Sequence, residues 1–304
     1  MSRRPSPRSA PAPGPRAKRP NPAAGPTPGH AARPGAAPLR RATSARNPAL
    51  ALVRALSAKK VRRERRLFVA EGEDLIDAAL ARGIRLTALL VDAERVPADD
   101  PRLLATAYLG ERYAVAPELM ARVSELAAPP RMLAVLPQPG PHHFRTVPFP
   151  PQLALYLTAV SDPGNVGTLV RTAAALGCDW VALGPGSADP FHPRAVRAAM
   201  GATLALPLLE GVTGADLATR EGFGVVAAVP AGGLPPWEAD LRGPLVLALG
   251  AERAGVGGAL AELERAGRVV EVTIPQAPGT DSLNVAAAGA ILLAEARRQR
   301  ALEA

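Results

Sequence analysis

Two side chains with chemical potential, Asn165 and Arg171, occur in the segment D-P-G-N-V-G-T-L-V-R-T-A. The preceding residues 153–159 are almost all apolar and suit a buried strand, 162–164 have turn composition, and the apolar residues that follow recur at helical spacing. Such a unit places its loop at the carboxyl edge of a parallel sheet, where open α/β folds bind ligands. Arg is effectively never deprotonated, so Arg171 offers a fixed positive charge and Asn165 a hydrogen-bonding amide. Alternatively, Asn165 only caps the helix and Arg171 is a solvated surface residue.

A carboxylate stands at a second strand end. Glu252 lies between Gly250 and Gly255, directly after the apolar run 245–249. Glycines there let backbone approach a ligand closely. The stretch is not a P-loop, because no Lys-Ser or Lys-Thr follows Gly255, and no G-x-G-x-x-G opens a helix. By itself Glu252 would be a surface acid.

The third polar stretch is I-P-Q-A-P-G-T-D-S-L-N-V-A-A-A, which contains Ser282 and Asn284. Asn284 enters a helix whose next ten residues are uncharged, so we expect its amide to be buried and to need a partner. Ser282 is a candidate cap for that helix. Since all three polar loops follow strands of one predicted sheet, they are expected to converge on one site.

Alternating strands and helices over 152–304 predict an α/β domain with a parallel sheet covered on both faces. A smaller α/β domain is predicted over 44–137, and the proline-rich segment 138–151 is predicted to be an extended linker between the two. Residues 1–43, rich in Pro, Ala, Gly and Arg, are predicted to be a disordered tail. His142 and His143 lie on the linker without a nearby third ligand, so no metal site is expected.

The composition favours a soluble cytoplasmic protein. Apolar residues make up 48% of the 304 residues, which is enough for two cores, while aromatics are only 3%, so the cores are built from Leu, Val and Ala. The single cysteine excludes a disulfide framework, and no run is long and apolar enough for a membrane span or a signal peptide.

The net charge of +9 comes entirely from the first part of the chain, because residues 1–46 hold ten Lys or Arg and no acidic residue. The tail could attract polyanions, be inert, or be a transit peptide that its prolines disfavour. A second basic cluster lies inside the small domain, and its density favours contact with nucleic-acid phosphates over a merely solvated face. Its members are Lys59, Lys60, Arg62, Arg63, Arg65 and Arg66.

In their order, the three polar stretches resemble the three motifs of the SpoU/TrmH-type RNA ribose 2′-O-methyltransferases of the SPOUT superfamily. Residues 44–136, with the stretch F-V-A-E-G, resemble the ribosomal-protein-like substrate-binding domain that precedes the catalytic domain in many members. The resemblance implies S-adenosylmethionine as cofactor, a C-terminal trefoil knot, which is a rare exception to topology rules, and a homodimer. It also implies an RNA partner, with 23S ribosomal RNA favoured; the alternatives are tRNA, or a non-catalytic RNA-binding or ribosome-assembly protein.

The resemblance assigns roles by position. Asn165 and Arg171 match the catalytic pair of the first motif, Glu252 the acid of the second, and Ser282 and Asn284 the polar pair of the third. The cofactor-binding positions are implied to be Leu249, Gly250, Ile274, Ser282 and Leu283. Gln276 stands where Met is common and Pro278 where Gly is common, so we expect a stiffer cofactor loop.

Methyl transfer to a ribose hydroxyl is an in-line displacement, and positioning supplies much of its rate. None of the three motifs contains a His or Lys to act as base. We therefore expect Arg171 to bind the phosphate beside the target ribose and to stabilise the developing oxyanion, although the family is often described with Arg as the base. Asn165 and Glu252 would hold Arg171 and the substrate.

Overall fold

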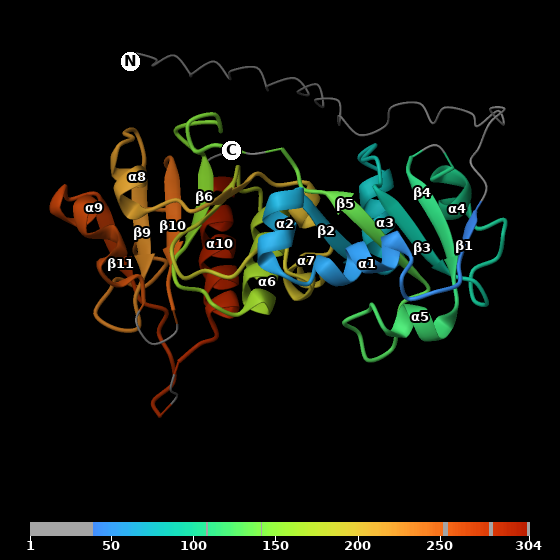
Figure 1. Ribbon diagram of the computed structural model, residues 1–304. Helices are drawn as coiled ribbons and strands as arrows, with labels where there is room; N and C mark the ends of the chain where they lie inside the picture. Colours follow the sequence, from blue (N-terminus) through green and yellow to red (C-terminus); the bar gives the residue numbers. More distant parts are fainter. Residues whose placement is uncertain (1–38, 108, 141, 252–254, 280–281, 303–304) are drawn as a thin grey trace, which may run out of the picture. The chain divides into compact units, whose positions relative to one another are not determined.

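The computed structural model describes residues 39–107, 109–140, 142–251, 255–279 and 282–302 (Figure 1). The predicted tail, apart from residues 39–43, and Glu252 lie outside these ranges. Within them the chain forms two sheets, one in each half.

The C-terminal sheet is entirely parallel, in the order β11-β9-β10-β6-β7-β8. Its strands are β6 Leu153–Leu157, β7 Val181–Leu183, β8 Leu208–Glu210, β9 Gly224–Ala228, β10 Leu245–Leu249 and β11 Val269–Val272. The α-helices are α6 Pro163–Ala175, α7 Pro193–Ala199, α8 Gly214–Ala218, α9 Ala261–Arg265 and α10 Val285–Ala301, and short 3₁₀ turns cover Ala202–Leu204 and Gly257–Leu260. This confirms the predicted α/β fold with a parallel sheet, whose strand order no periodicity could supply.

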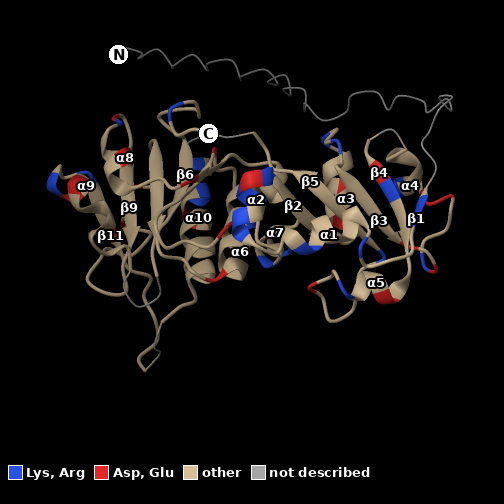
Figure 2. Ribbon diagram, viewed as in Figure 1, with Lys and Arg blue, Asp and Glu red and all other residues tan. Residues whose placement is uncertain are grey.

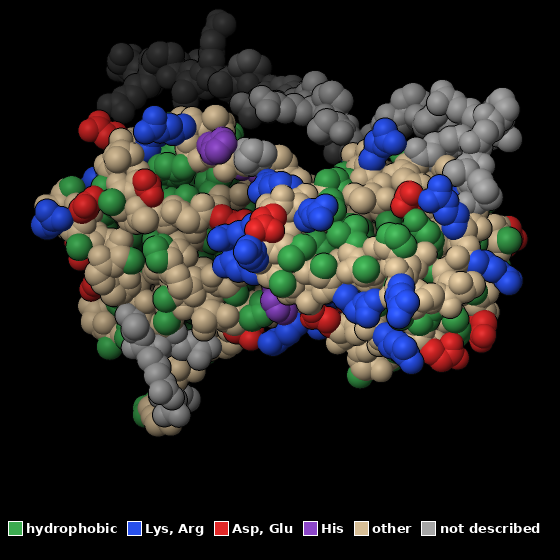
Figure 3. Space-filling view, in the orientation of Figure 1, with side chains coloured by type: hydrophobic (Ala, Val, Ile, Leu, Met, Phe, Trp, Pro, Cys, Tyr) green, Lys and Arg blue, Asp and Glu red, His purple; other side chains and the backbone are tan. Residues whose placement is uncertain are grey.

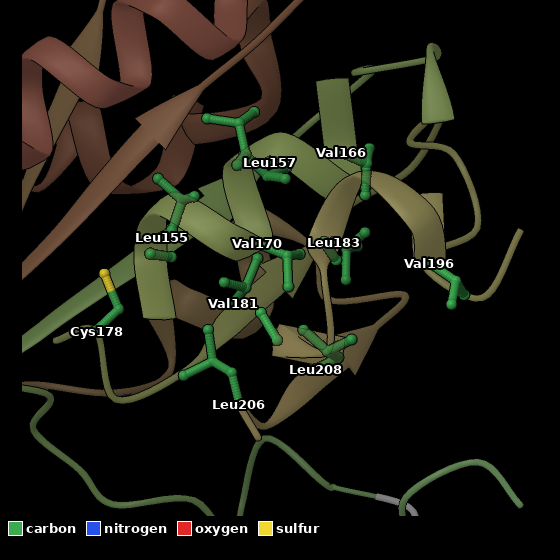
Figure 4. Packing of buried hydrophobic residues seen from close by; sticks show 14 of the residues in the cluster. Leu155, Leu157, Val166, Val170, Cys178, Val181, Leu183, Val196, Leu206 and Leu208 are labelled. Atoms are coloured by element: carbon green, nitrogen blue, oxygen red, sulfur yellow. The ribbon is translucent and has the colours of Figure 1, made fainter. Parts of the chain in front are cut away.

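Both faces of this sheet are covered, as its central strand shows. Along β6, Leu155 and Leu157 face a core formed with α6, α7 and α10, whereas Tyr156 faces a second core formed with α8 and α9. Successive strand side chains point to opposite faces, so an uninterrupted apolar run is what a strand buried on both sides requires. Figure 4 shows the first core, in which side chains of β6, β7, α6 and α7 meet.

Two glycines allow the helices of the first face to approach closely. A Cβ atom on Gly167 of α6 would overlap the Ala195 carbonyl of α7, and one on Gly289 of α10 would overlap Leu169 and lie 2.7 Å from the Leu249 side chain. Helix α6 therefore packs closely on α7 and on α10, because neither glycine has a side chain at the contact. This close packing holds the beginnings of α6 and α10 next to each other.

The N-terminal sheet is mixed, in the order β1-β4-β3-β5-β2, with β5 antiparallel to both neighbours. Its elements are β1 Arg40–Ala42, α1 Pro48–Ala55, α2 Lys59–Arg65, β2 Leu67–Glu71, α3 Glu73–Leu80, β3 Ala88–Asp92, α4 Pro101–Ala105, β4 Glu111–Val115, α5 Pro117–Ala121 and β5 Met132–Pro137. Strand β1 lies within the residues predicted to be tail: Arg40–Ala42 pair in parallel with Tyr113–Val115. Backbone hydrogen bonds to the open edge of β4 make this strand, and composition carries no signal of them.

The proline-rich linker, predicted as an extended spacer, docks its aromatic side chains on the C-terminal half. The Phe149 ring stacks on Trp180 at 6.5 Å between centroids and meets Phe223 edge to face at 5.1 Å. Phe144 joins the group, and the Arg220 guanidinium lies 4.1 Å from the Phe149 ring centroid. Proline prevents regular structure here, but the aromatic side chains still bury themselves.

The two sheets share one apolar core. Phe68 of β2 contacts Phe191, which precedes α7, with ring centroids 5.3 Å apart. Residues 39–302 thus form a single compact unit in the described ranges.

Candidate active site

A pocket opens at the carboxyl ends of β9, β10 and β11, against the beginning of α10. It is lined by Ala228, Val229, Pro230, Leu249, Gly250, Ala251, Gly255, Val272, Ile274, Gln276, Ser282, Leu283, Val285 and Ala288. The lining includes all five positions that the family resemblance assigned to the cofactor. Prediction missed the contribution of residues 228–230, because only the strand order reveals that β9 lies beside β10.

The glycines of the second motif shape one wall of this pocket. A Cβ atom on Gly250 would overlap the backbone of Gly255, and Gly255 itself has a φ of +57°. The Gly255 amide donates to the Ala251 carbonyl at 2.7 Å, which closes the loop into a tight turn. The predicted acid Glu252 lies outside the described residues.

The first and third motifs meet directly through their asparagines. Asn284 Nδ2 donates to Asn165 Oδ1 at 3.1 Å, across 119 residues of sequence. The prediction that the Asn284 amide needs a partner is consistent with this, but the residue is exposed, not buried.

Both helices at this junction begin with a different cap from the one expected. Asp162 caps α6, accepting from the Asn165 amide at 2.9 Å, so Asn165 lies in the first turn and its side chain is directed elsewhere. Asn284, not Ser282, caps α10, accepting from the Ala286 amide at 2.9 Å. Asn, Asp and Ser are comparable caps, so position decides: the oxygens of Asp162 and Asn284 are the ones that reach free N–H groups of the first turn.

Asp162 connects the first motif to α7. Its second oxygen accepts from Arg194 Nη2 at 3.1 Å. The backbone hydrogen bond from Asn165, with help from Arg194, holds the pKa of the Asp162 carboxyl below its usual range. Asp162 is therefore ionised at neutral pH, as suits an anion at a helix N-terminus.

Arg171 lies two turns further along α6. It is exposed, does not line the pocket, and has no hydrogen bond or ion pair with another residue of the described ranges. Its side chain is accordingly available to a ligand. Ser282, the remaining member of the predicted catalytic set, is exposed at the pocket.

The predicted basic cluster forms α2 and its end, and Figure 2 shows the charges gathered there. One member is assigned wrongly: Arg62 is only 1% exposed and forms a buried ion pair with Asp189, so it cannot contact phosphate. Arg63 pairs with Glu210 at the surface, and Arg66 donates to the Pro139 carbonyl. The other three, Lys59, Lys60 and Arg65, are exposed, and Figure 3 shows Lys and Arg side chains gathered on the surface where α2 lies.

No group of three His, Cys, Asp or Glu side chains in the described ranges is arranged to hold a metal ion. In the same ranges, no helix has both the length and the apolar composition to cross a membrane.

Both halves of the chain match known protein families. Residues 152–294 match the SpoU rRNA Methylase family, and residues 47–134 match the MRM3-like substrate binding domain. An uncharacterized tRNA/rRNA methyltransferase of Synechocystis sp. is 33% identical over 85% of this chain and 93% of that protein. The 23S rRNA (guanosine(2553)-2′-O)-methyltransferase RlmP of Bacillus subtilis is 33% identical over 82% of this chain and 96% of its own length.

Solved structures agree. An AdoMet-bound rRNA methyltransferase from Sinorhizobium meliloti superposes with a TM-score of 0.75 at 32% identity, over 86% of this chain and 98% of that one. AviRb, a SpoU methyltransferase of Streptomyces viridochromogenes in complex with AdoMet, gives a TM-score of 0.74 at 27% identity, over 84% and 99%.

Proposed function

Because the chain belongs to the SpoU rRNA methylase family, we propose that it is an S-adenosylmethionine-dependent methyltransferase that modifies a ribose 2′-hydroxyl of 23S ribosomal RNA. One observation carries the proposal: the pocket lined by the predicted cofactor residues is joined to the first motif by the hydrogen bond between Asn284 and Asn165. Relatives that are 23S rRNA 2′-O-methyltransferases support the choice of substrate.

The pocket fits S-adenosylmethionine. Leu249, Ile274 and Leu283 provide apolar walls for an adenine and a methionine chain, and the Gly250 backbone leaves room where a Cβ atom would not fit. When bound, this group supplies the methyl that is transferred. Orientation of the acceptor then falls to the asparagine pair and to Arg171.

The asparagine pair holds the acceptor side of the site. With its Oδ1 engaged by Asn284, Asn165 keeps its own amide N–H groups, which donate to no residue of the described ranges, for the RNA. Arg171 binds the phosphate beside the target ribose and stabilises the developing oxyanion. Glu252 stays assigned to holding Arg171 and substrate, as the resemblance implies.

The pH dependence of single-turnover methylation distinguishes two roles for Arg171. A phosphate-binding Arg gives a rate that keeps rising with hydroxide, as the 2′-hydroxyl itself ionises. A titrating Arg base gives a plateau that disappears in Arg171→Ala. The second result would assign to Arg171 the role of the base that accepts the proton of the 2′-hydroxyl.

A homodimer and a C-terminal knot complete the proposal. The solvent-facing side of α10 carries Ala287, Ile291 and Ala294, and Ile291 is 42% exposed. This exposed apolar stripe suits a second copy of the chain. Helix α10 packs on α6, which carries Arg171, so the second copy would also build a site around that guanidinium. Sedimentation equilibrium at micromolar concentration should give the mass of two chains; the mass of one would remove the dimer.

RNA contacts are assigned to the exposed part of the basic cluster. Neutralising Lys59, Lys60 and Arg65 together should lower RNA affinity and reduce its salt dependence, with S-adenosylmethionine affinity unchanged. If the variant and wild type bind RNA with equal affinity in a filter-binding titration, the cluster is only a solvated face. The basic tail is tested in the same assay by deleting residues 1–38, and an unchanged salt slope would make it inert.

Mapping of 2′-O-methylation in ribosomal and transfer RNA, with and without the gene, tests the function itself. We expect one ribose of 23S RNA to lose its methyl group, and the purified protein to restore it with S-adenosylmethionine. Loss of a tRNA methyl group would move the substrate to tRNA. Unchanged methylation together with defective ribosomes would favour a non-catalytic assembly protein.

A further inference from the structure

The Arg62–Asp189 pair connects the two sheets through an otherwise apolar contact. Arg62 Nε and Nη2 donate to Asp189 Oδ2 at 2.9 and 2.6 Å. Nη1 donates to the carbonyls of Leu56 and Ser57 at 2.8 and 2.6 Å. Arg62 is 1% exposed and Asp189 is 7% exposed. Four of the five N–H groups of the guanidinium thus donate within the protein, and its burial keeps it from RNA.

The contact around this pair is apolar and close. Phe68 packs on Phe191, and a Cβ atom on Gly201 would lie 2.7 Å from the Ala78 side chain of α3. Apolar contact holds the two halves together but is not directional, so by itself it would let one half slide along the other. In this buried ion pair two guanidinium N–H groups converge on the single oxygen Oδ2 of Asp189, an arrangement that only a narrow range of positions satisfies. Fixing a register is the best-attested use of buried pairs.

The Asp189 segment leads directly to the active site. The Asp189 backbone neighbour Ala188 donates to the Val160 carbonyl at 2.9 Å, just before Asp162. On the other side, Asp189 Oδ1 accepts from the Phe191 amide at 2.8 Å, where the chain enters α7. Arg194 of α7 then pairs with Asp162, which caps α6 at Asn165.

We propose that Arg62 and Asp189 are positioning residues that fix the register of the substrate-binding half against the catalytic half. The pair thereby selects which ribose of the bound RNA reaches Asn165. The selection of a ribose rests on the proposed function, whereas the fixing of the register does not.

The chain offers a matched control on the same helix. Arg63, the next residue, also bridges the halves, through Glu210 at 2.9 Å, but its side chain is 55% exposed. Exposed ion pairs are screened by water and constrain geometry little. Removing the Arg63–Glu210 pair should therefore leave the register unchanged.

Distance measurement between the halves tests the register without any RNA. Spin labels are attached to the full-length chain at cysteines replacing Glu118 and Glu221, both exposed, while the native Cys178 is buried. Wild type and Arg63→Met/Glu210→Leu should give one narrow distance distribution. Arg62→Met/Asp189→Leu, which leaves no unpaired buried charge, should give a broad or multimodal one. A single narrow distribution in that variant overturns the proposal.

A conservative variant covers the case in which the apolar pair does not fold. Arg62→Lys keeps the charge but replaces the planar fork by a point charge, so its distribution should broaden less. A distribution as narrow as that of wild type in Arg62→Lys, with the double variant unfolded, would make the pair purely structural.

Methylation of 23S RNA gives the second readout. The Arg62→Met/Asp189→Leu variant should methylate secondary riboses and show a KM for RNA raised about tenfold or more, with S-adenosylmethionine affinity unchanged. Unaltered site choice and KM would refute the selection of a ribose. If wild type methylates no RNA, the proposed function fails, and the label distances still decide the register.

Discussion

Replacing Gly250 with alanine should damage the cofactor pocket while sparing the rest of the fold. The new Cβ atom would overlap the Gly255 carbonyl, and backbone of the same turn cannot yield as a side-chain tip can. The turn must open, which breaks the hydrogen bond from the Gly255 amide to the Ala251 carbonyl.

Two terms set the size of the effect. The broken hydrogen bond contributes about 1 kcal/mol, and overpacking typically costs about 1–3 kcal/mol. Their sum is roughly 2–4 kcal/mol, and each ~1.4 kcal/mol expressed in binding is a factor of ten. Because the turn forms one wall of the pocket, we expect S-adenosylmethionine affinity to fall by at least about thirtyfold.

Isothermal titration with S-adenosylmethionine measures this loss. Gly243→Ala is the control: it lies just before the other end of β10, and a Cβ atom there would have no neighbour within 4 Å. Its affinity should match wild type. If Gly250→Ala binds S-adenosylmethionine as wild type does, the turn is not a wall of the cofactor site and the assignment of the pocket is wrong.

Substitutions at Arg171 and Asn284 test two parts of the site, and labelling of Cys178 tests the core. Arg171→Ala should leave the fold and S-adenosylmethionine affinity intact but slow single-turnover methylation by roughly a hundredfold or more, and Arg171→Lys should not rescue it; a wild-type rate would refute its role. Asn284→Ala should lower the melting temperature by about 2–4 °C, because the α10 cap is lost. Asn284→Asp keeps the cap but cannot donate to Asn165, so it should lose activity while the melting temperature stays nearly unchanged. Burial raises the pKa of the Cys178 thiol to about 12, so iodoacetamide at pH 8 should modify only unfolded protein. The free energy of unfolding should fall as pH rises from about 8.5 toward that value, because only the unfolded thiol ionises there. Rapid labelling of folded protein, read by mass spectrometry, would contradict this.

Local patterns predicted the strands that matter and the ends at which ligands bind. The run 245–249 is β10 as observed, and 153–159 contains β6, because a strand buried on both faces must be apolar throughout. Convergence of the polar loops followed from the parallel arrangement. Which loops touch did not, because strand order depends on crossovers that leave no periodic trace.

Long-range partners account for the main errors. Arg62 is indistinguishable in sequence from its basic neighbours, and its partner Asp189 lies 127 residues away. Strand β1 is a basic tripeptide that owes its conformation to the free edge of β4. The caps were misassigned by only a few residues, since several Asp, Asn and Ser side chains near each helix start are acceptable caps and geometry decides between them.

Docking of the linker aromatics on Trp180 shortens the tether between the halves. Strand β5 ends at Pro137 and the ring cluster begins at Phe144, so only six residues, 138–143, separate the two attachments. A fully extended chain of that length spans roughly 20 Å. If the contact between the sheets opens while the aromatic anchor holds, the small half stays within that radius and faces its docking surface at an effective concentration in the millimolar range. Re-docking is then a local event, and its rate is independent of protein concentration.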